Sequence, residues 1–420
     1  MSFFDKILGR SKIKGNCLLA LDIGTEFVKA LIVRIDENNK KGEIIGAGFE
    51  PQKTSHMIAG AVTDIPGVAQ TCRKAIETGQ KEAKEKISQA VIGIAGEFVK
   101  GATFSFACER EDQKQKIELP ELKNIIQKIQ WKAFNKIRQD LAEESGISEI
   151  EVKLINATIV DVKIDGYQVT NPLGFQGREI TLGVFNAYAP LMHLGAINSI
   201  AKALNLELLF IAAEPYAIAR SVDIEGGGDA IFIDIGGGTT DIALMRQGGL
   251  EGIKSFALGG RAFTKRLCDN LSLDFAQAEQ IKLKYSSGEI SSGVKKKISD
   301  IFRQDIKVWL SGVNLALNEF SKLSPLPPKI LLCGGGSSLL GIKKALESGE
   351  WIHDLPVLQA PEVNFIDPAK IISIEDKTGR LKEPKDVTPL ALASLSTQLL
   401  GEEEGLFAPM LRRAIRLMQT

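Results

Sequence analysis

The sequence is poor in cysteine and histidine, and neither residue type is clustered. It has five cysteines and three histidines in 420 residues. No two of them have the spacing of zinc ligands, which argues against a zinc site. We expect free thiols in a reducing compartment rather than disulfides. The cysteines are Cys17, Cys72, Cys108, Cys268 and Cys333.

The chain also lacks an excess of either charge and any long apolar run. Lysine plus arginine and aspartate plus glutamate both number 52, so no overall field attracts nucleic acid. No uninterrupted apolar run approaches the roughly 18 residues that a membrane span requires. Asp5 and Lys6 interrupt the short apolar run near the N-terminus, which argues against a secretory signal. We predict a soluble or peripheral protein that binds no nucleic acid.

Two glycine turns between apolar, β-rich segments are the first positive signal. One is Asp22-Ile23-Gly24-Thr25 within residues 17–36, and the other is Asp234 to Asp241 within Ala230 to Leu244. The order of strand, acidic residue, glycine turn, threonine and strand occurs twice. Since the chain is too long for one core, we predict two related lobes.

These turns have the composition of phosphate-binding loops. Glycines let backbone N–H groups approach a phosphate closely. Asp22 and Asp234 suit hydrated magnesium, while Thr25 and Thr239 suit a phosphate oxygen. Either turn alone could be an ordinary hairpin. Their repetition favours a shared phosphate site.

A third glycine-rich loop, Gly334 to Ser338, follows a predicted strand and precedes a helix. Ligands gather at this position in open α/β sheets, although a plain strand-to-helix turn is the alternative. The chain has no Gly-Lys-Ser/Thr phosphate loop and no dinucleotide pattern of alternating glycines after its first strand. We therefore expect the paired hairpins, rather than either of those motifs, to hold the phosphates.

The three loops resemble the phosphate-1, phosphate-2 and adenosine motifs of the actin, Hsp70 and hexokinase superfamily. Within it, the chain resembles the FtsA family of bacterial cell-division proteins and the related PilM family, over about residues 17–345. The additional segments that carry this resemblance are Asn171-Pro172-Leu173-Gly174 with Gly177, Gly259-Gly260-Arg261, and Ala278-Glu279-Gln280-Ile281-Lys282.

The resemblance implies an α/β fold: a two-lobed actin-like ATPase of duplicated ribonuclease H-like domains, with an inserted small α+β subdomain. The implied parts are 17–88, the first part of lobe 1 (1A); 89–178, the inserted SHS2-like subdomain (1C); 179–212, the second part of lobe 1; 213–400, lobe 2 (2A, with a reduced 2B at about 284–320); and 401–420, a linker and amphipathic C-terminal helix.

The resemblance also assigns roles at the site. Asp22 and Asp234 would position Mg²⁺ through water, and Glu214 would orient the attacking water or serve as a helix cap or interlobe contact. The residues expected around the ATP phosphates are Gly24, Thr25, Gly236, Gly237, Gly238 and Thr239. Those expected around adenine and ribose are Gly260, Lys265, Glu279, Lys282, Gly335, Gly336 and Ser337. Catalysis by positioning and charge neutralisation implies weak, slow ATPase activity at most.

The C-terminal tail has the pattern of a cationic amphipathic helix that begins near Ala408. Such a helix can lie in an anionic membrane interface, or it can dock on the body of the protein. FtsA-like proteins end in a membrane-targeting helix. The residues expected at the membrane are Leu406, Phe407, Met410, Leu411, Arg412, Arg413, Ile415 and Arg416.

The FtsA resemblance implies a protein on the cytoplasmic face of the inner membrane that binds ATP and polymerises. It would tether the FtsZ ring through the FtsZ C-terminal peptide and recruit later division proteins to the septum. The compact segment 284–320 is closer to the PilM family, which implies a cytoplasmic platform for type IV pili that binds a PilN-like peptide. A small-molecule kinase of the same superfamily is a third interpretation.

Overall fold

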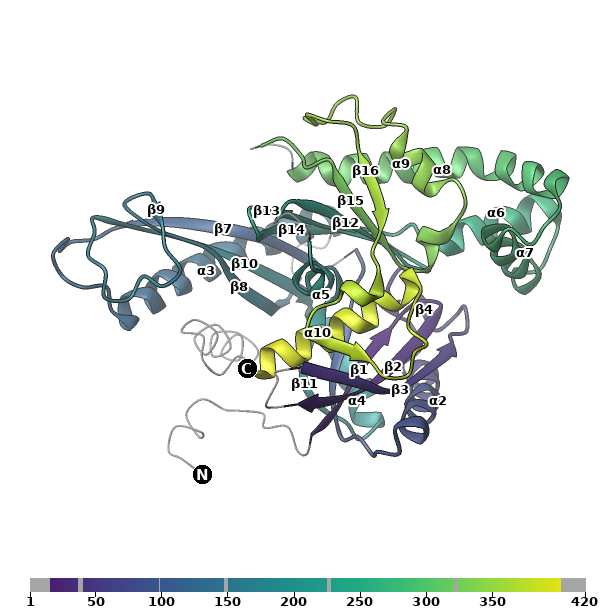
Figure 1. Ribbon diagram of the computed structural model, residues 1–420, viewed down its shortest axis with the longest axis horizontal. Helices are drawn as coiled ribbons and strands as arrows, with labels where there is room; N and C mark the ends of the chain where they lie inside the picture. The colour runs from purple at the N-terminus through teal and green to yellow at the C-terminus, as the bar shows by residue number, and fades with distance from the viewer. Residues whose placement is uncertain are drawn as a thin grey trace.

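In the computed structural model the chain forms two lobes and a long β-rich arm (Figure 1). The structure describes residues 16–36, 41–97, 99–146, 150–224, 228–320 and 324–401. Within these residues one sheet has six strands in the order β11-β6-β1-β2-β3-β17. A second has nine, in the order β16-β15-β12-β13-β14-β7-β10-β8-β9, and β4 and β5 (Met57–Ile58 and Ala61–Val62) form a small hairpin.

The six-stranded sheet is the core of the first lobe. Helix α2 packs so closely on β3 that a Cβ atom at Gly48 would lie 1.9 Å from the carbonyl oxygen of Ala75. The side chain of Asp64 caps α2 by accepting from the N–H of Gly67 at 3.0 Å. The elements are β1 (Cys17–Ile23), β2 (Phe27–Asp36), β3 (Lys41–Pro51), α2 (Ile65–Ala83), β6 (Gln89–Ile94), α4 (Leu191–Ala203), β11 (Glu207–Ala213) and α5 (Glu214–Ser221).

The second lobe is built on one end of the nine-stranded sheet. The side chain of Trp309 on α8 is fully buried, and its Nε1 donates to Thr240 Oγ1 at 2.9 Å. This contact fixes the long helix against the second glycine hairpin. The elements are β12 (Ala230–Ile235), β13 (Thr240–Arg246), β14 (Gly249–Phe256), α6 (Gly260–Leu271), α7 (Phe275–Ser287), α8 (Ser292–Phe320), β15 (Lys329–Cys333), η1 (Gly335–Ser338), α9 (Ile342–Glu347) and β16 (Glu362–Phe365).

The arm seen in Figure 1 is the other end of that sheet, with α3 packed on it. It joins the second lobe where β7 pairs with β14, at Gly252 with Ala102 and at Ile253 with Gly101. Its elements are β7 (Lys100–Glu109), α3 (Leu119–Ser145), β8 (Val152–Ile164), β9 (Tyr167–Gln168) and β10 (Glu179–Pro190).

Two boundary segments differ from the division made from the sequence. Residues 89–94 form β6 of the first lobe, whereas the sequence-based division assigned them to the inserted subdomain, residues 89–178. Residues 179–190 form β10, which pairs with both β7 and β8 in the arm rather than with the first lobe. Only the hydrogen-bond partners of β10 show to which sheet it belongs.

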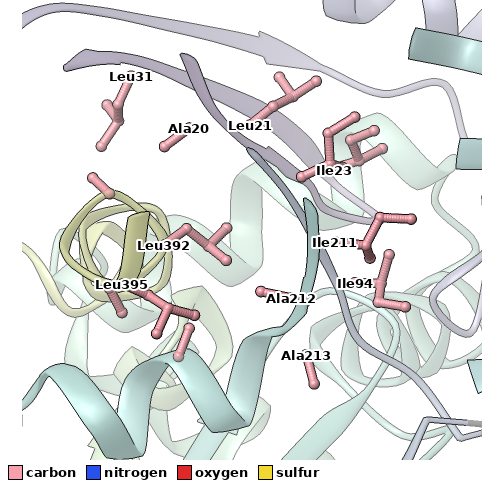
Figure 2. Packing of buried hydrophobic residues seen from close by; sticks show 14 of the residues in the cluster. Ala20, Leu21, Ile23, Leu31, Ile94, Ile211, Ala212, Ala213, Leu392 and Leu395 are labelled. Carbon is pink, nitrogen blue, oxygen red and sulfur yellow. The ribbon is translucent and has the colours of Figure 1, made fainter. Parts of the chain in front are cut away.

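The chain returns to the first lobe after β16, through residues 367–401, which we call the strap. The strap holds η2 (Pro368–Lys370), β17 (Ile374–Asp376), η3 (Pro384–Asp386) and α10 (Val387–Gly401). Strand β17 pairs with β3, and α10 packs on β1, β2 and β6. Figure 2 shows Leu392 and Leu395 of α10 among side chains of that sheet. The strap therefore belongs spatially to the first lobe, although the sequence places residues 213–400 in the second.

The predicted amphipathic tail, residues 402–420, lies outside the described residues, as do residues 1–15. In the described part of the chain, no helix combines the length and apolar character needed to cross a bilayer. All five cysteines are free thiols, and Cys72 and Cys333 are buried.

Candidate nucleotide site

The turns of the two glycine hairpins face each other across the lobes. A Cβ atom at Gly238 would lie 2.8 Å from Thr25 Oγ1, and one at Gly237 would lie 2.4 Å from Glu26 Cγ. Within the turns, the N–H of Gly24 donates to the carbonyl oxygen of Phe27 at 3.1 Å, and a matching bond closes the second turn. Gly237 and Gly238 thus permit an approach that no side chain would allow.

The third glycine loop lies against the second hairpin. Gly334 has φ +81°, and a Cβ atom there would lie 2.0 Å from Asp234 Oδ1. A Cβ atom at Gly336 would lie 2.9 Å from the carbonyl oxygen of Ile235 and 3.2 Å from that of Gly236. The structure therefore brings together three loops that are far apart in the sequence.

The first hairpin places a lysine directly opposite its aspartate. Asp22 and Lys29 are cross-strand partners, and Lys29 Nζ donates to Asp22 Oδ2 at 2.9 Å. Burial is the largest single effect and would lower the pKa of Lys29, but the charge of Asp22, its hydrogen bond and the other nearby carboxylates together outweigh it, so the pKa is raised. The lysine therefore remains protonated. Asp234 and Glu214 contribute to the same effect.

The second hairpin instead places one carboxylate opposite another. Asp234 and Asp241 are cross-strand partners in β12 and β13, and both are buried. Asp241 is held by Thr239 Oγ1 at 2.8 Å, by the hydroxyl of Ser255 and by the N–H of Gly96. Burial raises its pKa in spite of these bonds. Like charges at opposed positions disfavour the folded state unless something neutralises them.

One carboxylate oxygen of Asp234 has a hydrogen-bond donor and the other has none. Its Oδ2 accepts from Thr388 Oγ1 at 2.6 Å, whereas Oδ1 is buried and has no hydrogen-bond partner. Burial raises the pKa of Asp234 to about 6, against the opposing effect of the Thr388 bond. A buried carboxylate oxygen without a partner is costly and indicates a missing cation, donor or water.

Glu214, at the start of α5, lies close to this group of carboxylates. Burial raises its pKa well above the usual range, and the charges of Asp22, Asp234 and Asp241 raise it further. A Cβ atom at Gly93 would lie 2.8 Å from Glu214 Oε1, so the glycine leaves room for the glutamate. The side chain has the burial and raised pKa typical of functional carboxylates.

These residues fit a hydrated magnesium ion. No three or more histidine, cysteine or acidic side chains in the described residues are grouped as a direct metal cage. Mg²⁺ seldom uses such a cage, because it retains several waters and binds through one or two carboxylates and substrate phosphates. Asp22 from one lobe and Asp234, with its unpartnered Oδ1, from the other supply that kind of donor set.

The residues expected around the purine lie on α6, α7 and the third loop. Lys282 Nζ donates to the carbonyl oxygen of Gly260 at 3.1 Å and to Thr264 Oγ1 at 2.9 Å, and it pairs with Glu279 at 2.8 Å. Lys265 is exposed on α6. The hydroxyl of Ser337 donates to the carbonyl oxygen of Gly334 at 2.7 Å. In this arrangement that hydroxyl closes the third loop.

An arginine to which the sequence motifs gave no role joins the two lobes. Arg261, at the start of α6, forms an ion pair with Glu26. Its guanidinium also donates to the carbonyl oxygens of Thr25 at 2.7 Å, Met57 at 2.8 Å and Thr54 at 3.2 Å. All four acceptors belong to the first lobe. We call this set of contacts the Arg261 clamp.

Sequence reasoning also missed Lys29 and Thr388 as parts of the site. Lys29 had a usable signal, because a hairpin turn that starts after Asp22 puts a lone lysine opposite that aspartate. Thr388 had none, since 154 residues separate it from Asp234.

Stability should depend on pH through Asp234. Its pKa is about 6 in the folded protein against 3.8 ordinarily. The folded state therefore binds more protons between these values, and acidification through this range stabilises it. Without nucleotide, Asp234→Asn should be more stable than wild type at pH 7.5 by about 3 kcal/mol. Urea unfolding should show that difference shrink toward pH 5. A difference that stays constant with pH would contradict the assignment.

The chain is similar in sequence to known cell-division proteins. The family model described as "Cell division protein FtsA" matches residues 231–390. A "Cell division protein FtsA" of Neisseria meningitidis is 27% identical over an alignment of 411 positions. The alignment covers 91% of this chain and 90% of that protein. One of Pseudomonas aeruginosa is 24% identical over 366 residues, 82% of each. The chain resembles FtsA over most of its length. This confirms the resemblance expected from the sequence.

A solved structure supports the fold of this FtsA-like chain. The "PilM-PilN type IV pilus biogenesis complex" contains a chain that aligns with a TM-score of 0.62 at 19% identity, covering 90% of this chain and 98% of that one. At this identity the match shows the fold alone. Together with the FtsA relatives it confirms a two-lobed actin-like α/β fold.

Proposed function

We propose that the chain binds ATP with Mg²⁺ where its three glycine loops meet. The observation that carries the proposal is the convergence of both hairpins and the third loop on Asp22 and Asp234, with Asp234 Oδ1 buried and unpartnered. Backbone N–H groups of residues 24–25 and 236–239 would hold the phosphates. When bound, Mg²⁺ would neutralise phosphate charge.

We assign the purine and ribose to the surroundings of Gly260, Lys265, Glu279 and Lys282, with the third loop, residues 335–337, on the other side. Glu214 would orient the attacking water, since its buried carboxylate lies close enough to Asp22 and Asp234 for their charges to act on it. Hydrolysis would be slow, because the described site offers positioning and charge rather than a covalent nucleophile.

At the level of the cell we propose an FtsA-like role in division. The support is the similarity to proteins named "Cell division protein FtsA", two of which align over 82% and 91% of this chain. The protein would polymerise on the cytoplasmic face of the cell membrane and tether FtsZ. The segment expected to be a reduced 2B is largely helix α8, Ser292–Phe320.

A groove between α6 and α8 is the candidate surface for the FtsZ peptide. It has a volume of about 430 Å³ and belongs to the second lobe, where α8 fills most of the segment expected to be a reduced 2B. Lys297 and Arg266 give it basic groups, although Arg266 is already paired with Asp305. Its lining residues are Arg266, Asn270, Lys297, Asp300, Ile301 and Gln304.

Membrane attachment is the part of this proposal that rests on the tail. Deletion of residues 405–420 should abolish co-sedimentation with anionic liposomes in the presence of ATP, because one amphipathic helix would supply most of the binding. Nucleotide affinity should stay as in the full chain, since the deleted residues lie outside the three loops. Liposome binding that survives the deletion would argue for a tail docked on the body.

A further inference from the structure

Within four consecutive residues, the strap contacts one candidate magnesium-positioning aspartate, Asp234, directly and the other, Asp22, through Lys29. The carbonyl oxygen of Lys385 accepts from Lys29 Nζ at 2.9 Å, and the same Nζ donates to Asp22 Oδ2 at 2.9 Å. Three residues later, Thr388 Oγ1 donates to Asp234 Oδ2 at 2.6 Å. The glycine motifs do not account for this connection. It links one carboxylate of each lobe to a single short piece of chain.

The Thr388 bond decides which oxygen of Asp234 is available. Oδ2 is occupied by the threonine, and Oδ1 is buried without a partner. Gly334 packs on the Oδ1 side, where a Cβ atom would come within 2.0 Å of that oxygen, so only glycine fits beside it. A carboxylate held at one oxygen by a buried donor keeps a fixed orientation, because rotation would break that bond.

The piece of chain that carries Thr388 is itself held in place. The N–H of Gly334 donates to the carbonyl oxygen of Pro384 at 3.0 Å, and the N–H of Glu383 donates to Asp386 Oδ2 at 2.9 Å. Thr388 is only 3% exposed and lies in the first turn of α10. Its hydroxyl is therefore presented from a rigid base that packs against the first lobe.

We propose that residues 385–388 form a positioning bridge in which Thr388 orients Asp234 toward the hydrated Mg²⁺ of the bound nucleotide. The inference rests on the proposed nucleotide site. Thr388 is a positioning residue, since it reaches the metal only through the aspartate. Groups that hold a metal-binding carboxylate typically control metal affinity by about 10- to 100-fold. The bridge also makes the spacing between Asp22 and Asp234 depend on the strap.

The test compares three variants of the full-length protein. Thr388→Val removes the hydroxyl at nearly constant volume, and Thr388→Ser retains it. Thr397→Val makes the same change on the same helix, at a threonine that is 1% exposed and donates to the carbonyl oxygen of Ala393. The readouts are ADP affinity by calorimetry with and without Mg²⁺, Mn²⁺ binding by electron paramagnetic resonance in the presence of ADP, and thermal unfolding.

In wild type, Mg²⁺ should increase the affinity for ADP. In Thr388→Val this increase should be about tenfold smaller, and the affinity for Mn²⁺ should fall by about the same factor. Its affinity for ADP without metal should equal that of wild type. Thr388→Ser and Thr397→Val should behave as wild type. Unchanged metal dependence in Thr388→Val would overturn the bridge, and so would an equal loss in Thr397→Val. If wild type itself showed no metal-dependent ADP binding, the nucleotide site would fail together with the bridge.

Discussion

Gly238→Arg is expected to abolish measurable ATP binding. A Cβ atom at this position would lie 2.8 Å from Thr25 Oγ1, so a long side chain must push the two phosphate hairpins apart. Losing two or more charge-assisted phosphate contacts would cost about 3 kcal/mol or more, which corresponds to an affinity loss of about 100-fold or more. Calorimetry or a fluorescent ATP analogue measures this directly.

Gly195→Arg is the matched control for that variant. Gly195 is exposed on α4 and lies outside the three loops, and a Cβ atom there would meet no heavy atom within 4 Å. Its substitution makes the same chemical change and should leave ATP affinity within a factor of about two, because isolated surface changes are usually small. Wild-type affinity in Gly238→Arg would refute the assignment of the second hairpin as a phosphate loop.

Arg261→Ala is expected to weaken the coupling between the lobes. The substitution removes the ion pair with Glu26 and three bonds to carbonyl oxygens of the first lobe. The charged side chains are 12% and 24% exposed. Because the pair is partly solvated, the free energy of unfolding should fall by about 2–3 kcal/mol, somewhat less than for a fully buried pair. ATP affinity should fall as well, since Thr25 loses a contact that fixes the first hairpin.

Arg266→Ala provides the comparison on the same helix. Arg266 forms a two-pronged ion pair with Asp305, but its side chain is 46% exposed and the pair stays within the second lobe. An exposed pair of this kind contributes little to stability, because water screens the two charges. Urea unfolding of both variants separates a clamp between lobes from an ordinary surface ion pair. Equal effects of the two substitutions would show that Arg261 has no special role.

Much of the fold could be predicted because its signals are local. The hairpins at residues 17–36 and 230–246 follow from glycine turns between apolar runs, and the strand expected before the third glycine loop is β15, Lys329–Cys333. Periodicity and turn chemistry act over a few residues, so the sequence carries them directly.

The features that were missed depend on long-range pairing. No local pattern shows that β10 joins the arm, that β17 adds to β3, or that Thr388 reaches Asp234. Helix α10 is apolar on all sides, which predicts burial but not the lobe in which it is buried. The Arg261 clamp was equally hidden, because its acceptors are mostly backbone carbonyl oxygens more than 200 residues away. Such contacts require the tertiary structure.

The measurement that tests the account most directly is a comparison of two peptides on the purified, ATP-loaded chain. One is the C-terminal peptide of FtsZ and the other is the N-terminal peptide of a PilN-like pilus protein, each labelled and titrated by fluorescence anisotropy. An FtsA-like division protein should bind the FtsZ peptide and ignore the pilus peptide. Binding of the pilus peptide, with no response to the FtsZ peptide, would contradict the division role and favour a pilus platform.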